Sequence, residues 1–123
     1  MNKEYVMRVA QTIKEQLVTM TSIEILMSWG MEKFMPTVFK GLPGVKFHVN
    51  GRLFQGDVLI CLNGSDYYEV YLQDDTRVEC INDEVCFDEL GSVIDCAIES
   101  GKDKAEYDKF CEQEWQKLLK IIV

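Results

Sequence analysis

The first part of the chain carries apolar residues that recur every three or four positions. Over residues 4–17 this spacing places them on one face, with charged side chains elsewhere, and so predicts an amphipathic helix. The apolar face consists of Val6, Val9, Ala10, Ile13 and Leu17. Thr21, followed by Glu24, matches a capping box, in which both side chains accept hydrogen bonds from backbone N–H groups. This predicts a second, short helix over residues 22–29, which ends at Gly30.

Four residues that interrupt regular structure follow this helix: Pro36, Gly41, Pro43 and Gly44. We expect a loop around a short strand there. From residue 45 onward apolar and polar positions alternate, which is typical of β-strands with one buried face. The pattern therefore changes from helix to sheet near residue 45.

The strongest turn signal of the sheet region is Asn50-Gly51. This pair suits the positive φ angles of a two-residue hairpin turn, which would place Phe47 opposite Phe54. The apolar segment over residues 57–62 follows, and its two apolar faces are typical of an inner strand.

Two more segments complete the expected sheet. A turn at residues 63–66 leads into a strand over residues 67–72. Residues 77–81 and 85–87 are then expected to pair as a last short hairpin around residues 82–84. Strands joined by short turns pair in antiparallel order, so the sequence predicts an antiparallel meander of about four to five short strands.

Helical spacing returns near the end of the chain. Asp88 is expected to cap a helix over residues 88–99 that ends at Gly101. A further helix over residues 103–122 would follow at once and complete an αα-hairpin. We therefore expect a single α+β domain over residues 1–123: an N-terminal helix or helices, the meander, and the αα-hairpin packed on one face of the sheet.

Composition supports one soluble unit. The chain has 123 residues, of which 47% are hydrophobic and 28% charged, and its formal net charge is −8. An average negative potential repels phosphate, so we expect no direct binding of nucleic acid. No apolar segment approaches the roughly 18 residues that cross a bilayer, and the chain begins without the pattern of a secretory signal. We expect a cytoplasmic protein that does not contact a membrane.

Motifs for metals and cofactors are missing from the sequence. The five cysteines are Cys61, Cys80, Cys86, Cys96 and Cys111. Their spacing does not match a zinc site and their number is odd, so we expect reduced thiols. Neither the dinucleotide-binding nor the phosphate-loop glycine motif occurs. We expect no metal, no cofactor and no catalytic residue.

A small enzyme is the alternative. His48 is the only histidine, so histidine chemistry would have to pair it with Cys61 on a neighbouring strand or with a pair of acids. Burial in an apolar strand raises the pKa of a thiol, which disfavours Cys61 as the nucleophile. We therefore interpret His48 as a partly exposed strand residue and expect a non-enzymatic protein.

Charge is distributed unevenly along the chain. Residues 1–56 hold seven basic and four acidic side chains, residues 57–100 hold one and twelve, and residues 101–123 hold five of each. The acidic middle predicts an interaction face with aromatic side chains for a basic protein partner. Its candidate residues are Tyr67, Glu69, Tyr71, Asp88, Asp95 and Glu99. The simpler alternative is a solvated face that keeps the protein soluble.

Three segments resemble a pattern in small uncharacterised phage, prophage and mobile-element proteins. They are residues 26–34, residues 58–70 with Leu-Asn-Gly-x-Asp-x-Tyr, and residues 87–90 with Asp-x-Leu. The resemblance implies a mobile-element origin and assigns no catalytic residue. Together with the acidic face, it suggests a host nucleic-acid enzyme as the basic partner. A structural or accessory domain that forms a homodimer through the apolar C-terminal helix, residues 118–123, is a further alternative.

Overall fold

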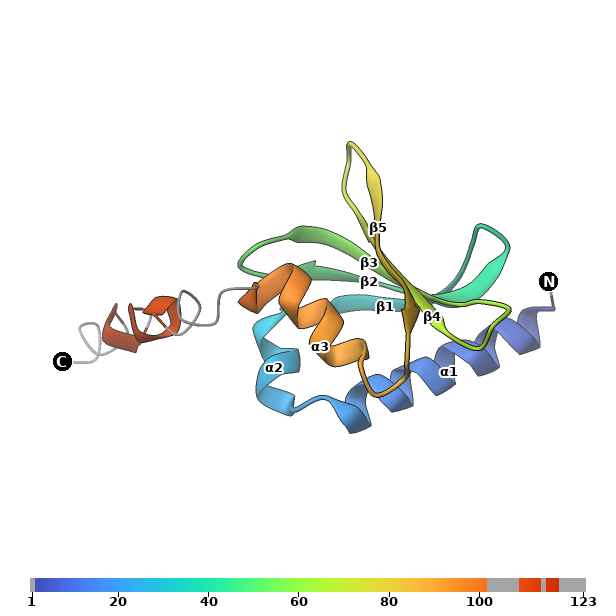
Figure 1. Ribbon diagram of the computed structural model, residues 1–123, viewed down its shortest axis with the longest axis horizontal. Helices are drawn as coiled ribbons and strands as arrows, with labels where there is room; N and C mark the ends of the chain where they lie inside the picture. Colours follow the sequence, from blue (N-terminus) through green and yellow to red (C-terminus); the bar gives the residue numbers. More distant parts are fainter. Residues whose placement is uncertain (1, 102–108, 114, 118–123) are drawn as a thin grey trace.

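A five-stranded antiparallel sheet with helices against one face forms most of the molecule (Figure 1). The computed structural model describes residues 2–101, 109–113 and 115–117. The strands are β1 (Glu32–Phe39), β2 (Leu42–Asn50), β3 (Gln55–Leu62), β4 (Tyr68–Gln73) and β5 (Val78–Val85). The helices are α1 (Lys3–Met20), α2 (Ile23–Ser28) and α3 (Leu90–Asp95), which continues into a π-helical turn, η1 (Cys96–Ser100). The strands lie in sequence order, so the predicted α+β class with an antiparallel meander is confirmed.

Helix α1 has the predicted apolar face. Its buried residues are the five that the spacing indicated. Asn2 caps the helix, and its side chain accepts a hydrogen bond of 2.8 Å from the Glu4 backbone N–H. The buried face packs against β1 and β2, so helical periodicity alone was enough to orient this element.

Helix α2 is capped by Ser22 and not by Thr21, which corrects the predicted capping box. The Ser22 hydroxyl accepts a hydrogen bond of 3.4 Å from the Ile25 backbone N–H. Thr21 is buried against Gly91 of α3, where a Cβ would collide with its side chain. Its position is therefore set by packing between helices. Gly30, with a φ of 59°, ends the helix as expected.

Strand β1 replaces the loop that Pro36 and the glycines predicted. β1 is an edge strand, and an edge strand tolerates proline because the N–H groups along its free side need no partner in the sheet. Phe39 pairs with Leu42, so Lys40-Gly41 forms the two-residue turn, with φ angles of 52° and 76°. Two positive φ angles are typical of a type I′ turn. The sequence predicted such a turn at Asn50-Gly51 and not at this position.

The loop between β2 and β3 is longer than predicted. Asn50 pairs with Gln55, and Phe47 lies opposite Val58 instead of Phe54. Bonds to the far end of η1 hold the four-residue loop. The Leu53 backbone N–H donates to the Ile98 carbonyl oxygen at 2.7 Å. These tertiary contacts outweigh the local preference of Asn50-Gly51 for a tight turn.

Strand β5 is one continuous strand, so the predicted hairpin around residues 82–84 is wrong. Asn82 itself pairs with Val70 of β4. The register shifts on both sides of that pair, and such bulges bend and twist a strand. β5 is the second edge of the sheet, where polar side chains meet solvent without loss of the ladder. Its polar composition therefore did not require a turn.

The helix after β5 starts later than expected. Glu89 is the N-cap residue and makes no side-chain capping bond, so the prediction of Asp88 as the cap is wrong. The helix ends at Gly101, with a φ of 74°, as predicted. Residues 109–113 and 115–117 are helical, and the Arg52 guanidinium lies 5.2 Å from the centre of the Phe110 ring. The rest of the expected second helix lies outside the described residues, and its packing on the sheet stays a prediction.

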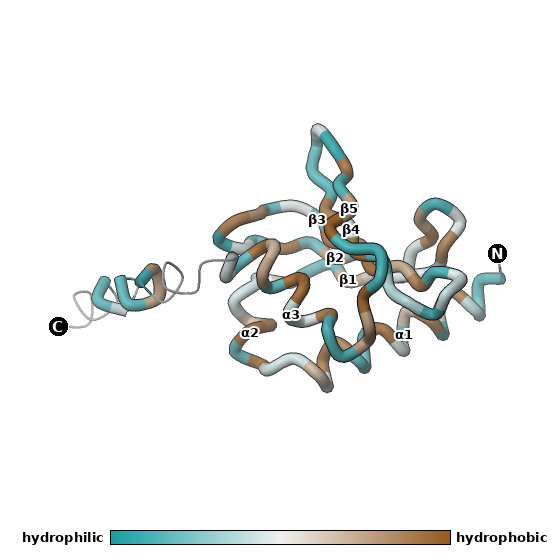
Figure 2. Tube along the Cα trace, viewed as in Figure 1, coloured by the Kyte–Doolittle hydropathy of each residue, from teal (hydrophilic) through white to brown (hydrophobic). Residues whose placement is uncertain are grey.

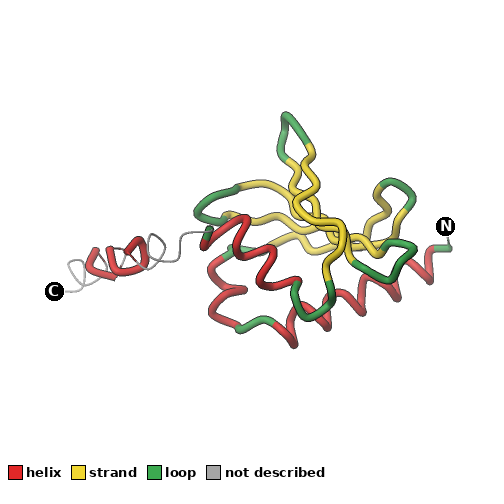
Figure 3. The backbone as a smooth tube through the Cα atoms, viewed as in Figure 1, coloured by secondary structure: helices red, strands yellow, loops and turns green. Residues whose placement is uncertain are grey.

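Two apolar clusters occupy the two faces of the sheet. The main core lies between the helices and the inner face, and apolar stretches of both layers meet there (Figure 2). Its fully buried large side chains include Ile13, Trp29, Phe47, Ile60 and Ile94. A small cluster on the outer face contains Leu59, Cys61 and Tyr71. The β1–β2 and β4–β5 hairpins rise on that outer side, away from the helices (Figure 3). Among the described helices, none combines the length and apolar character that a membrane span requires.

Candidate functional site

The six residues of the predicted interaction face lie on two sides of the sheet. Along β4, Tyr68 and Val70 point into the main core, so Glu69 and Tyr71 belong to the outer face. Asp88, Asp95 and Glu99 belong to the segment that packs on the inner face. The sheet therefore separates the two halves of the predicted face.

Four of the six side chains are occupied by internal contacts. The Tyr71 hydroxyl donates to Glu69 Oε1 at 2.5 Å, and this hydrogen bond raises the pKa of Tyr71. Asp95 accepts a hydrogen bond of 2.9 Å from the Trp29 indole. Glu99 is only 7% exposed and accepts one of 2.6 Å from the Arg52 backbone N–H. Tyr67 and Asp88 alone among the six are exposed.

A different set of acidic residues lies along β5 and in the turns before and after it. Seven acids and one base, Arg77, lie within residues 74–89, and all eight side chains belong to exposed residues. We call the acids the acidic edge: Asp74, Asp75, Glu79, Asp83, Glu84, Asp88 and Glu89. The tip of the β4–β5 hairpin is largely hydrophilic in Figure 2. This surface gives the acidic middle of the sequence a location that segment counts could not supply.

Asp74 stabilises the turn between β4 and β5, where the acidic edge begins. Its carboxylate accepts hydrogen bonds from the Thr76 hydroxyl at 2.7 Å and from the backbone N–H groups of Thr76 and Arg77. These bonds favour the charged form and lower the pKa of Asp74. The carboxylate therefore shapes the hairpin as well as charging it.

An apolar groove runs beside the acidic edge, between β5 and the helical segment α3–η1. It has a volume of about 710 Å³, and its lining includes Leu53, Ile81, Val93, Cys96 and Ala97. We call it the β5 groove. Glu79 of the acidic edge contributes to its wall. An apolar centre with a charged rim is the usual anatomy of a protein interface.

His48 and Cys61 are not brought together. His48 lies opposite Asp57 and Cys61 lies opposite Gly44, so four ladder positions separate them, or about 13 Å along the strands. Cys61 is fully buried, and this burial, with the charge of Glu69, raises the pKa of its thiol to about 12. His48 is therefore too far from Cys61 to activate its thiol, and the pairing of His48 with acids stays a prediction.

The buried state of Cys61 predicts low thiol reactivity. At pH 8, a thiol with a pKa near 12 is ionised in only about one molecule in ten thousand. A short pulse of N-ethylmaleimide, followed by peptide mass spectrometry, should label the exposed Cys80 and leave Cys61 unmodified. Labelling in denaturant provides the control, because both thiols should then react at similar rates. Equal labelling in the native protein would contradict the buried position.

His48 instead belongs to a cluster with Asp57 and Lys46. His48 Nδ1 lies 3.2 Å from Asp57 Oδ1, and Lys46 Nζ lies 3.5 Å from Asp57 Oδ2. Their side chains are about one-third exposed on the outer face. Neither Lys46 nor Asp57 was predicted from the sequence as a site residue. The alternation in residues 45–49 places Lys46 beside His48, but Asp57 joins them only in the observed register.

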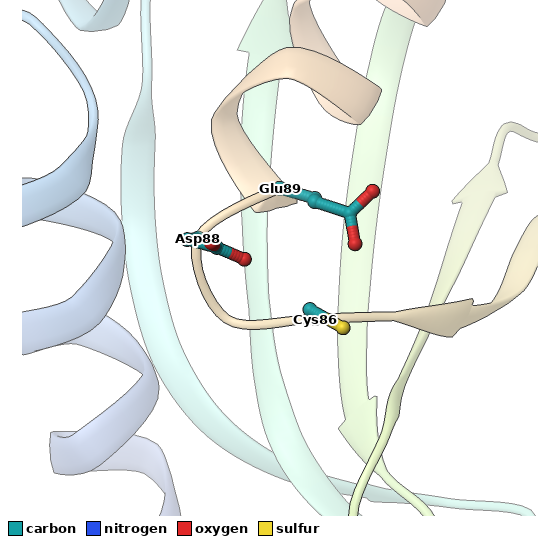
Figure 4. Close-up of side chains that lie close together, drawn as sticks. All are labelled: Cys86, Asp88 and Glu89. Carbon is teal, nitrogen blue, oxygen red and sulfur yellow. The ribbon is translucent and has the colours of Figure 1, made fainter.

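Cys86, Asp88 and Glu89 form a third group, in the turn between β5 and α3 (Figure 4). One sulfur or oxygen atom of each lies within 4.8 Å of the others. A hydrogen bond to Glu89, and then partial burial and the two negative charges, raise the pKa of the Cys86 thiol. Exposed acidic groups commonly lie together without an ion. The group therefore identifies no metal centre.

Comparison with protein-family models, curated protein sequences and solved structures found no match to this chain. The role of each residue must therefore be argued from its own geometry.

Proposed function

We propose that this protein is a non-enzymatic interaction module that binds a basic protein segment over the acidic edge and the β5 groove. The observation that carries the proposal is the net charge of −6 within residues 74–89, all on exposed residues, beside an apolar groove of about 710 Å³. No comparable run of acids lies elsewhere among the described residues.

Electrostatics determines which partner fits. Clustered carboxylates attract a cationic segment and accelerate its encounter with the surface. The same carboxylates repel a second acidic edge, so two copies of this surface disfavour each other. They also repel phosphate, and we expect no binding of a DNA duplex. A segment with lysine or arginine side chains is the occupant that charge complementarity selects.

The β5 groove provides the apolar part of the contact. Ile81, Val93 and Ala97 are only partly buried, so a partner's apolar side chains would remove further surface from water. Such burial supplies affinity, while the surrounding acids supply selectivity. The partner segment should therefore be amphipathic as well as basic.

The phage-like sequence pattern suggests the source of such a partner. A host nucleic-acid enzyme carries basic side chains along its DNA channel, and an acidic surface complements them. In this proposal the protein occupies that channel and blocks the nucleic acid. Genes for phage or conjugation functions beside this one would support the origin, and a metabolic operon would speak against it.

The C-terminal segment is the competing occupant. Gly101, which lines the β5 groove, lies two residues before the predicted helix over residues 103–122 in the sequence. In the alternative, this helix packs back on the domain as an αα-hairpin or pairs with a second copy through residues 118–123. Light scattering at micromolar concentration distinguishes the homodimer, and a monomer would exclude it.

The test uses fluorescence anisotropy with a labelled peptide of alternating lysine and valine. The triple variant Glu79→Gln/Asp83→Asn/Glu84→Gln should bind the peptide about tenfold more weakly, because it removes three charges from the acidic edge. The matched control Glu15→Gln/Glu24→Gln/Glu32→Gln removes three charges from exposed residues elsewhere and should change binding less than about twofold. Equal weakening in both variants would mean that only net charge matters and would overturn the proposed surface. An absence of peptide binding to the unmodified protein would also overturn it.

A further inference from the structure

A second pocket, independent of the acidic edge, lies at the other side of the sheet. It opens on the outer face where β1, β2 and β3 run side by side, and its volume is about 310 Å³. Its lining consists of Lys33, Met35, Lys46, Phe47, His48 and Asp57. Three basic or potentially cationic side chains therefore face one carboxylate, in a protein whose net charge is −8.

A bulge in β1 builds one wall of this pocket. Glu32 pairs with His48 and Met35 pairs with Lys46, so two residues of β1 oppose the single residue Phe47. Such an extra residue redirects side chains and is common beside functional sites. The fold places Lys33 at this position with a φ of 57°, a left-handed conformation that costs a non-glycine residue of order 1 kcal/mol.

The bulge places the Phe34 side chain against the core and the neighbouring Lys33 and Met35 side chains at the pocket. The Phe34 ring stacks on Phe47 with centroids 5.5 Å apart, and Phe34 packs against the main core. Lys33 and Met35 are left to line the pocket. Among the described residues Lys33 has no ion-pair partner within 4.0 Å, so its charge is available to a ligand.

Asp57 orients the histidine. Its two oxygens are used separately, one by His48 Nδ1 at 3.2 Å and the other by Lys46 Nζ at 3.5 Å. A hydrogen bond to Nδ1 fixes the ring and leaves Nε2 as the nitrogen available for a ligand. In the described part of the chain Nε2 makes no hydrogen bond. Glu32 lies opposite His48 in the register and is the other acid on this side of the strand, outside the pocket lining.

We propose that this pocket binds a small oxyanion, a phosphate or carboxylate group carried by a compact molecule. Lys33 and Lys46 supply charge, His48 Nε2 donates a hydrogen bond when the ring is protonated, and Asp57 holds His48 and Lys46 in position. Met35 provides apolar contact for the rest of the molecule. The volume lies at the lower end of the range for ligand pockets, which limits the ligand to a compact one.

The sole histidine makes a direct test possible. His48 gives the only imidazole signals in the proton–carbon NMR spectrum of the protein, so its ring reports on this pocket without assignment ambiguity. The protein is titrated at constant pH and ionic strength with inorganic phosphate, with acetate, and with chloride as the non-oxyanion control. Saturable movement of the His48 signals with phosphate or acetate, and not with chloride, is expected. The anion that binds with the higher affinity, phosphate or acetate, identifies the class of oxyanion.

Variants locate the binding. Lys33→Gln and Lys46→Gln should each weaken the affinity of the preferred anion about three- to tenfold, as expected for loss of one charge-assisted hydrogen bond. Lys14→Gln, which removes an exposed lysine from α1, should leave it unchanged. The proposal is overturned if neither oxyanion shifts the His48 signals, if chloride shifts them equally, or if Lys14→Gln weakens binding as much as Lys33→Gln. The result is independent of peptide binding at the acidic edge, because the two surfaces share no residue.

Discussion

Replacing Trp29 with alanine is expected to lower the free energy of unfolding by about 4 kcal/mol. Trp29 is fully buried, at the end of α2 within the main core. Its indole N–H donates to Asp95 at 2.9 Å and its carbonyl oxygen accepts from the Asn50 backbone N–H at 2.8 Å. The side chain thus links the end of α2 to α3, while the backbone carbonyl links it to the end of β2 and would remain in the alanine variant. Alanine would leave a large cavity and an unpaired, half-buried carboxylate.

Urea denaturation followed by far-ultraviolet circular dichroism measures this loss without relying on tryptophan fluorescence. Trp29→Phe is the matched variant, since it keeps most of the packing and removes the indole hydrogen bond. We expect it to cost about 1–2 kcal/mol. Domains of this size are stable by about 5–15 kcal/mol, so the alanine variant should lose from about a quarter to most of its free energy of unfolding. A loss below about 1 kcal/mol for Trp29→Ala would contradict its central position in the core.

Gly44→Ala should destabilise the sheet by about 3 kcal/mol, at the upper end of the usual range for overpacking. Gly44 lies in β2 opposite Cys61 of β3. A Cβ at this position would overlap the Ile60 carbonyl oxygen and lie 2.8 Å from the Cys61 Cα. Both atoms belong to the backbone of a central strand, so they can move only if the β2–β3 ladder is disturbed.

Gly64→Ala is the control for this substitution. Gly64 lies in the turn before β4, and a Cβ there would meet no heavy atom within 4 Å. The free energy of unfolding of the Gly64→Ala variant should differ from that of the unmodified protein by less than about 0.5 kcal/mol in the same denaturation experiment. Similar midpoints for Gly44→Ala and Gly64→Ala would show that the strands separate more easily than the structure indicates.

Local periodicity correctly predicted the features that depend on one helix or one strand alone. The buried face of α1 follows from apolar spacing alone, and the inner position of β3 follows from its two apolar faces. The loop after β2 could not be predicted in this way, because its length depends on bonds to Ile98 and Glu99, almost fifty residues away. The predicted register is displaced by four residues as a result.

An even displacement preserves which side chains share a face and changes which residues are opposite each other. This explains why Lys46 and His48 could be placed together from the sequence, whereas Asp57 could not be added to them. The position of the acidic residues was not predictable for a related reason. Counts along the chain do not distinguish the outer face, which carries Glu69, from the helical layer, which carries Glu99.

The two edges of the sheet have a consequence for the behaviour of concentrated solutions. Fibrils grow when a strand at one edge of a molecule pairs with an edge of the next, and this requires two regular, compatible edges. β1 carries the bulge at Lys33 and a proline without an N–H, while β5 carries two register shifts and the charges of the acidic edge. Neither edge offers a regular template, so we expect the native domain to resist edge-to-edge growth into fibrils.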